Sequence, residues 1–164
     1  MSEPKEAQPD VVSIPICMLF TGSIPMSASL FEFGILHSLM HMSWVKYTCG
    51  RIKSDYRYSN ETVYNKNPWP KVPSDKNVTK VEEKVQAVLE ARAKYADSSL
   101  ADLNDPLTMP PELVKAHNEL DKAVDLCYRP QPFSSEMGRM EFLFELYAEY
   151  TSPMFHEKKK GKKK

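Results

Sequence analysis

The chain has 164 residues, of which 41% are hydrophobic, so it is long enough for one domain with a modest core. Thirteen prolines against five glycines predict stiff connections between its elements. This composition argues against a free-standing enzyme built around a deep cleft. We expect a small core with long ordered loops.

The formal net charge is zero, but the charges are unevenly distributed. Six lysines lie within residues 158–164, and without them 16 basic residues stand against 22 acidic ones, a balance of −6. Residues 46–80 carry eight basic residues against Asp55, Glu61 and Asp75, a local charge of +5. A basic segment on an acidic body is typical of a directed contact with a polyanion, and a solvated surface is the alternative.

The cysteines, Cys17, Cys49 and Cys127, form no C-x-x-C pair. This spacing is typical of reduced thiols in a cytoplasm rather than of disulfides or a zinc site. Acidic residues precede the first apolar run, and that run is shorter than the ~18 residues that span a bilayer. We therefore expect a cytoplasmic protein without a signal peptide and without a membrane partner.

The hydrophobic pattern predicts a mainly α-helical protein, a bundle of about four helices with long proline-rich loops. A small irregular β or extended part is expected at the N-terminus, where residues 1–10 are polar and residues 11–20 resemble an edge strand. An apolar stripe at three- and four-residue steps predicts one helix from Ser29 to Gly50. Residues 51–59 alternate like a strand or extended loop, and the prolines of residues 65–73 exclude regular structure.

The second half of the chain is predicted to be helical. A capping box at Thr79–Glu82 opens a helix that runs to about Tyr95, and residues 99–104 form a single turn. Pro110 and Pro111 begin the next helix, where a missing N–H costs nothing, and Pro130 ends it. The last helix is expected to start after Ser134, to end before Pro153, and to bury Met137, Met140, Leu143, Phe144 and Tyr147.

His37 and His41 stand four residues apart, as two metal ligands on one helical face would. The glutamate of a metalloprotease helix is absent, so we favour partly buried helical histidines, with His117 at the edge of the core. Residues 67–70 (NPWP) invite comparison with the N-P-P-aromatic loop of enzymes that methylate DNA amino groups. The intervening tryptophan argues against a catalytic loop, and the isolated glycines offer no glycine-rich cofactor turn.

Basic and aromatic residues alternate between Trp44 and Lys71. Arginine and lysine neutralise phosphates, tyrosine hydroxyls fix position along the backbone, and arginine can read guanine. The alternative is that the tyrosines pack a local core from which the cations extend. The set comprises Trp44, Tyr47, Arg51, Lys53, Tyr56, Arg57, Tyr58, Tyr64, Lys66, Trp69 and Lys71.

Several sequence blocks between about Leu30 and Thr151 are collinear with a known family. They include residues 49–59 (CGRIKSDYRYS), residues 68–70 (PWP) and residues 105–111 (DPLTMPP). These blocks resemble the C-terminal end of type IIL-like restriction–modification methylases, long single chains that make N6-methyladenine in DNA. Arg129 departs from the family pattern, which has a glycine after the residue matching Tyr128.

The resemblance implies that this segment is the end of a target-recognition region followed by a helical tail. Its partners would be double-stranded DNA and a methyltransferase core on the same or another chain. No catalytic, cofactor-binding or metal residue is expected here, and S-adenosylmethionine is implied only for the complete enzyme. The predicted parts are a lead-in (1–28), a helix plus basic aromatic loop (29–73), a helical C-terminal domain (74–152) and a disordered lysine-rich tail (153–164). The predicted DNA-binding residues are Arg51, Lys53, Ser54, Tyr56, Arg57, Tyr58, Asn65 and Trp69.

Two alternatives remain open. The chain could be a non-enzymatic helical protein-interaction module, or a remnant of a disrupted methylase gene, in which these motifs survive as packing alone. In a third and weaker hypothesis the lysine tail binds nucleic acid non-specifically.

Overall fold

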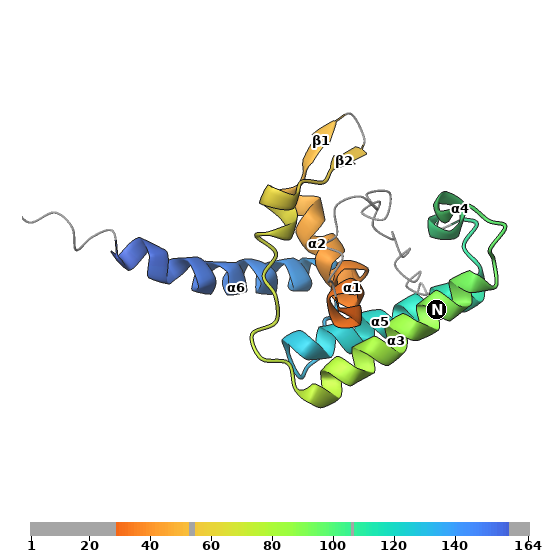
Figure 1. The fold of residues 1–164 in the computed structure, drawn as a ribbon. Coiled ribbons are helices and arrows are strands. Elements are labelled where there is room, and N and C mark those ends of the chain that lie inside the picture. Colours follow the sequence, from red (N-terminus) through yellow and green to blue (C-terminus); the bar gives the residue numbers. More distant parts are fainter. Residues whose placement is uncertain (1–28, 53–54, 106, 158–164) are drawn as a thin grey trace, which may run out of the picture.

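The structure, a computed structural model, describes residues 29–52, 55–105 and 107–157 (Figure 1). This part of the chain is mainly helical, as predicted, but the prediction of about four helices is wrong, since the described residues form six α-helices and one π-helix. The predicted strand at residues 11–20 and the tail at residues 158–164 lie outside it. The elements are α1 (Leu30–Leu36), α2 (Leu39–Thr48), β1 (Gly50–Ile52), β2 (Asp55–Arg57), the π-helix η2 (Asn60–Tyr64), α3 (Asp75–Ala93), α4 (Leu100–Asn104), α5 (Pro111–Tyr128) and α6 (Glu136–Glu157).

Helices α3 and α5 lie side by side and form the base on which the other elements rest (Figure 1). Both carry the apolar stripe that the sequence predicts, and its central residues are completely buried. Fully burying a Val or Leu side chain contributes ~1.5–3 kcal/mol, so this seam is a main source of stability. The fully buried residues of the seam are Val81, Val85, Val88, Leu113 and Val124.

Helix α1 packs closely against α3 because residue 34 has no side chain. A Cβ placed on Gly34 would lie 2.6 Å from Val81 Cγ1 and 2.8 Å from Val85 Cγ2, well inside normal contact. At its start, Ser29 and Glu32 form a reciprocal capping box. The sequence predicted the cap at Ser29, but it gave no sign of the close approach at Gly34.

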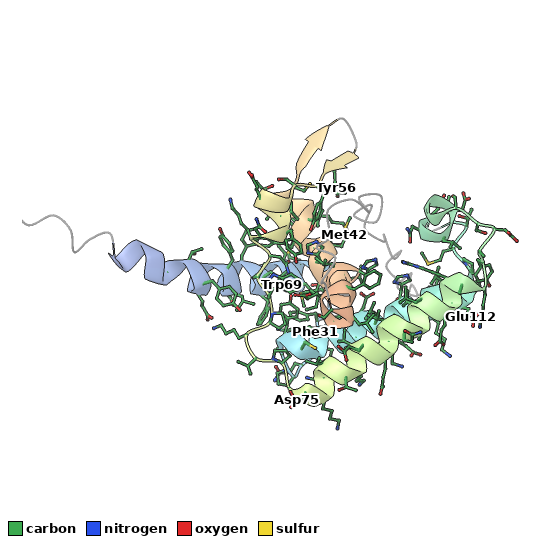
Figure 2. All side chains as sticks on the ribbon, in the orientation of Figure 1. Phe31, Met42, Tyr56, Trp69, Asp75 and Glu112 are labelled. Carbon is green, nitrogen blue, oxygen red and sulfur yellow. The ribbon has the colours of Figure 1, made fainter. Side chains whose placement is uncertain are left out.

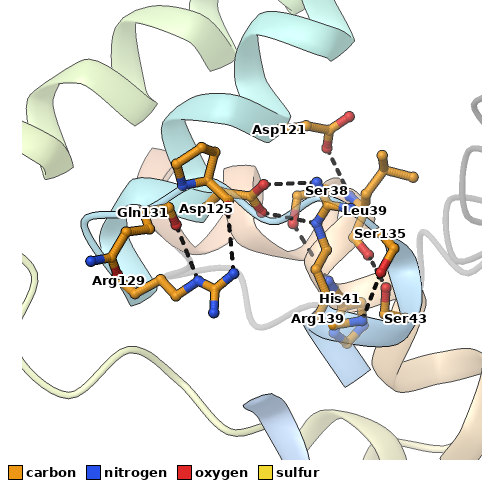
Figure 3. Close-up of polar contacts among 12 residues, drawn as sticks. Ser38, Leu39, His41, Ser43, Asp121, Asp125, Arg129, Gln131, Ser135 and Arg139 are labelled. Atoms are coloured by element: carbon orange, nitrogen blue, oxygen red, sulfur yellow. Dashed lines mark hydrogen bonds and ion pairs between the residues drawn. The ribbon is translucent and has the colours of Figure 1, made fainter. Parts of the chain in front are cut away.

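The prediction of one helix from Ser29 to Gly50 is wrong, because the chain breaks between α1 and α2. Ser38 adopts an extended conformation, its hydroxyl accepts from the His41 N–H, and it donates to the Ile35 carbonyl at 2.6 Å. The Asp121 carboxylate of α5 accepts the Leu39 N–H at 2.7 Å, at the electropositive start of α2 (Figure 3). A contact from a distant helix therefore fixes this break.

Two other predicted helix boundaries are wrong. Helix α3 begins after Ser74, whose hydroxyl accepts the Asn77 N–H, one turn before the predicted capping box. Helix α6 continues through Pro153 to Glu157, although a proline inside a helix removes a hydrogen bond and crowds the preceding turn. The short turn α4 and the start of α5 at Pro111 are as predicted.

Helix α6 also buries a narrower face than predicted. Leu143 and Leu146 are buried, whereas Met137 is 59% exposed and Phe144 is 42% exposed. Its first turns are joined to α5 by a two-pronged ion pair, in which Arg139 donates to the Asp125 carboxylate at 3.0 and 2.7 Å (Figure 3). This pair anchors the first turns of α6 to α5, and the rest of α6 extends away from the α3–α5 base (Figure 1).

Among the side chains that the structure describes, three histidines are buried, and all three are neutral at physiological pH. Burial, with the neighbouring Arg92 charge, lowers the pKa of His37 to about 3 and that of His117 to about 4. Burial also lowers the pKa of His41 to about 4. Among the described residues, no helix combines the length and apolarity needed to cross a bilayer.

Candidate nucleic-acid interface

A two-stranded hairpin stands above α2, away from the α3–α5 base (Figure 1). Its antiparallel register pairs Gly50 with Arg57, Arg51 with Tyr56, and Ile52 with Asp55. The predicted Arg51 and Arg57 therefore belong to adjacent strands, while Lys53 and Ser54 lie outside the described residues. The alternation over residues 51–59 predicted one strand or an extended loop, but the structure has two short antiparallel strands there.

Tyr56 and Tyr58 connect this hairpin to the helical body. Both rings are half-buried and pack against the hydrophobic core (Figure 2). The Tyr58 hydroxyl lies 3.2 Å from Nε2 of His41, and the two rings meet edge to face with centroids 5.8 Å apart. This arrangement combines the two sequence interpretations, because tyrosine side chains anchor a segment that also carries the predicted cations.

The π-helix η2 follows the hairpin and is held from below. Val63 is completely buried, and its carbonyl accepts the indole N–H of Trp44 at 3.2 Å. The Trp44 ring in turn contacts Phe144 and Tyr147 of α6, with centroids 5.5 and 5.4 Å away. Short π-helices often occur at functional sites, and this one is held directly by α2 and, through the Trp44 ring, indirectly by α6.

The Pro-Trp-Pro segment closes the loop against α6. The Trp69 ring meets the Tyr64 ring edge to face, with centroids 5.9 Å apart, and the Tyr150 hydroxyl donates to the Trp69 carbonyl at 2.6 Å. Asn65 and Lys66 are exposed on the same stretch. Trp69 is half-buried and holds the loop against Tyr64 and α6, whereas the side chain of Asn65 is accessible to a ligand.

Of the cations in residues 46–80 whose side chains the structure describes, two pair with acidic residues of α6. Lys46 lies 2.7 Å from Glu136, and Lys71 pairs with Glu149. Both pairs are partly exposed, so each contributes little to stability. These pairs reduce the positive charge that is available to a polyanion. Binding of a polyanion therefore depends more on the hairpin and on Lys66.

His41 binds both ends of the loop. Its Nδ1 lies 3.0 Å from the Asn67 side-chain oxygen, which can only accept, so Nδ1 carries the proton. Nε2 is then free to accept from the Tyr58 hydroxyl. The lowered pKa of His41 agrees with this neutral form, because a protonated ring could not accept a hydrogen bond.

The metal interpretation of His37 and His41 does not fit this geometry. The break at Ser38 separates them, and His37 Nδ1 donates to the Phe33 carbonyl at 2.8 Å. No group of three or more candidate ligand side chains occurs within the described ranges. Both histidines are buried, in agreement with the reading we favoured.

The sequence missed His41 and Asn67 as residues that organise the loop. Asn67 is 5% exposed, and its amide nitrogen is buried. Burial raises the pKa of Tyr128 of α5, and the neighbouring Asn67 side chain partly offsets that rise. The Asn67–His41 contact joins residues that are 26 positions apart in the sequence. No local sequence pattern predicts such a pair.

The comparisons with known proteins define the class. Residues 21–71 match the family model of the MmeI target recognition domain, and residues 72–155 match that of the MmeI C-terminal domain. The chain therefore belongs to the MmeI family, over its target recognition and C-terminal domains, as the resemblance in its sequence predicted.

Two particular relatives extend this assignment. DNA methyltransferase A of Bacillus subtilis (strain 168) is 43% identical over 124 residues, which are 76% of this chain and 14% of that protein. The solved structure of the type IIL restriction-modification enzyme MmeI in complex with DNA is 48% identical, with a TM-score of 0.73. That match covers 77% of this chain and 17% of the MmeI chain. This chain therefore spans less than a fifth of the length of either relative.

Proposed function

We propose that this chain is the DNA-contacting C-terminal portion of a restriction–modification adenine-N6 DNA methyltransferase. The hairpin β1–β2 and the exposed part of residues 60–67 would face double-stranded DNA. The helices from α3 onward would join this element to a methyltransferase core. The observation that carries the proposal is a hairpin containing Arg51 and Arg57, anchored on a rigid helical body, within the residues that match a target recognition domain.

The proposed division of labour follows from the chemistry present. Arginine and lysine supply phosphate contacts and groove readout, for which Arg51 and Arg57 of the hairpin strands are suited, as is Lys53 by its residue type. S-adenosylmethionine would be bound by the catalytic core of the complete enzyme, and we assign no step of methyl transfer to residues of this chain. Tyr58 and Trp69 would serve mainly by fixing the loop, because their side chains or backbone contact the body.

Arg57→Ala tests the proposal most simply. If Arg57 reads a base, DNA affinity should fall by ~1–3 kcal/mol, roughly 5- to 150-fold; if it contacts a phosphate, the salt slope should fall by about one. Fluorescence anisotropy of a labelled duplex, titrated at several salt concentrations, measures both quantities.

Lys122→Ala is the matched control, since Lys122 is an exposed cation on α5, on the base of the molecule. It removes the same unit of charge and should leave affinity within about twofold if binding is local to the hairpin. Equal effects of both variants, or an unchanged affinity and an unchanged salt slope in Arg57→Ala, would exclude Arg57 as a DNA contact.

The alternative, a helical protein-interaction module, has one supporting observation. Met137 and Phe144 of α6 and Tyr47 of α2 are 59%, 42% and 52% exposed, and exposed apolar groups can mark a protein contact. Under this alternative the chain would self-associate and would not bind DNA. Sedimentation with and without a duplex distinguishes the two functions.

A further inference from the structure

We infer that His41 is a positioning residue for DNA recognition, holding the hairpin through the Tyr58 hydroxyl. The inference rests on the proposed DNA-binding function, because it assigns a role at that same site. It concerns a residue that is 1% exposed and cannot itself touch DNA. Its influence would be exerted entirely through the backbone that follows β2.

The first step is the place of Tyr58 in the chain. β2 ends at Arg57, so Tyr58 is the next residue after the strand that contains the predicted DNA-reading arginine. A hydrogen bond at this residue restrains the orientation of the strand relative to α2. Recognition groups need to be held within ~0.5 Å of the productive geometry, and side chains behind them supply that restraint.

The second step is that the two hydrogen bonds of the imidazole have different importance. At the Asn67 end the chain is also held by the buried Pro68 and by the Tyr150 bond to the Trp69 carbonyl. At the Tyr58 end the Tyr56 and Tyr58 rings also pack against the core, but the bond to His41 acts directly on the residue that follows β2. Losing the Tyr58 bond should therefore loosen the hairpin more than losing the Asn67 bond.

Two substitutions separate these bonds. The amide of His41→Gln reaches the position of Nε2, where its oxygen can accept from Tyr58, but it lacks a donor for Asn67. The amide of His41→Asn lies at the position of Nδ1, where it can donate to Asn67, but it does not reach Tyr58. The two variants delete the same ring and differ by one methylene, so each is the control for the other.

The full chain should be tested with a mixed-sequence duplex and by native-state hydrogen exchange. We expect His41→Asn to weaken DNA binding at least fivefold and to speed exchange of hairpin amides, while His41→Gln stays within twofold of the parent. Amides of α3 and α5 should exchange at parental rates in both variants. A purely structural role would instead alter both variants alike, in affinity and in exchange, and would overturn the inference.

Tyr58→Phe provides a second route if either His41 variant fails to fold. It keeps the ring and removes only the hydroxyl, so it should reproduce the His41→Asn result. Tyr95 is a half-buried tyrosine beyond the end of α3, and the control variant Tyr95→Phe should leave DNA binding and hairpin exchange unchanged. Unchanged hairpin exchange in Tyr58→Phe would refute the positioning role whether or not the chain binds DNA. Failure of the parent chain to bind a duplex, with the exchange differences present, would refute the proposed function instead.

Discussion

Replacing Gly34 by alanine tests the close approach of α1 to α3. The new Cβ would lie 2.6 Å from Val81 Cγ1 and 2.8 Å from Val85 Cγ2, whereas carbon atoms normally approach to about 3.5–4 Å. Each contact must therefore open by about 1 Å. Both valines are completely buried and stiff at χ1, so the helices themselves have to move apart.

The cost can be worked from these contacts. Overpacking a core costs ~1–3 kcal/mol, and two simultaneous clashes place Gly34→Ala near the upper end. Alanine recovers ~1 kcal/mol of helix propensity. The expected net loss is ~2 kcal/mol, which lowers Tm by about 4–8 °C in a chain of this size.

Urea unfolding followed by circular dichroism measures this loss. Gly138→Ala is the control, because its Cβ would meet only Ser135 Oγ, at an ordinary 3.5 Å. That variant should keep its stability or gain up to ~1 kcal/mol. A Gly34→Ala protein as stable as the parent would refute the packing argument, and Val85→Ala should partly rescue it if the clash is real.

Three further outcomes are expected. Asp125→Ala leaves the Arg139 guanidinium buried without its carboxylate, and should cost ~3–5 kcal/mol in urea unfolding; a loss below ~1 kcal/mol would show that the pair is not needed. Because the pKa of each of the three buried histidines is lowered on folding, the unfolded chain binds more protons below pH ~6.5, and stability should fall as pH drops from there towards 4. Burial raises the pKa of Asp121 to about 7, so this group opposes that trend between pH ~4 and 7, and Asp121→Asn should make the acid loss steeper. Stability independent of pH over this range would contradict both assignments. Tyr150→Phe should cost ~0.5–1.5 kcal/mol through its bond to the Trp69 carbonyl, and equal stability would argue against that lock.

The stripe on α5 could be predicted because its periodicity comes from local spacing, and Leu113, Leu120 and Val124 are buried as expected, although the burial of Asp121 and Asp125 was not predicted. The break at Ser38 could not, because Asp121 stabilises it from 82 positions away. A sequence pattern contains no information on which distant carboxylate will reach a helix start. The continuous apolar stripe across residues 30–47 therefore concealed two helices.

The candidate site, like the fold, could be predicted from local sequence only in part. Arg51 and Arg57 stood out from composition, but the alternation around them did not reveal that they belong to two paired strands. His41 appeared as a generic buried histidine, since nothing local reveals that its two nitrogens bind Tyr58 and Asn67. Arg129, which departs from the family pattern, has φ −156° and ψ 155°, an extended conformation that requires no glycine.

Hydrogen exchange of the full chain with and without a DNA duplex tests the central claim most directly. We predict that bound DNA protects backbone amides in residues 50–67 and leaves those in the middle of α3 and α5 unchanged. Protection confined to the helices, or no protection in residues 50–67 under conditions where the duplex is bound, would contradict the claim that the hairpin and its loop face DNA.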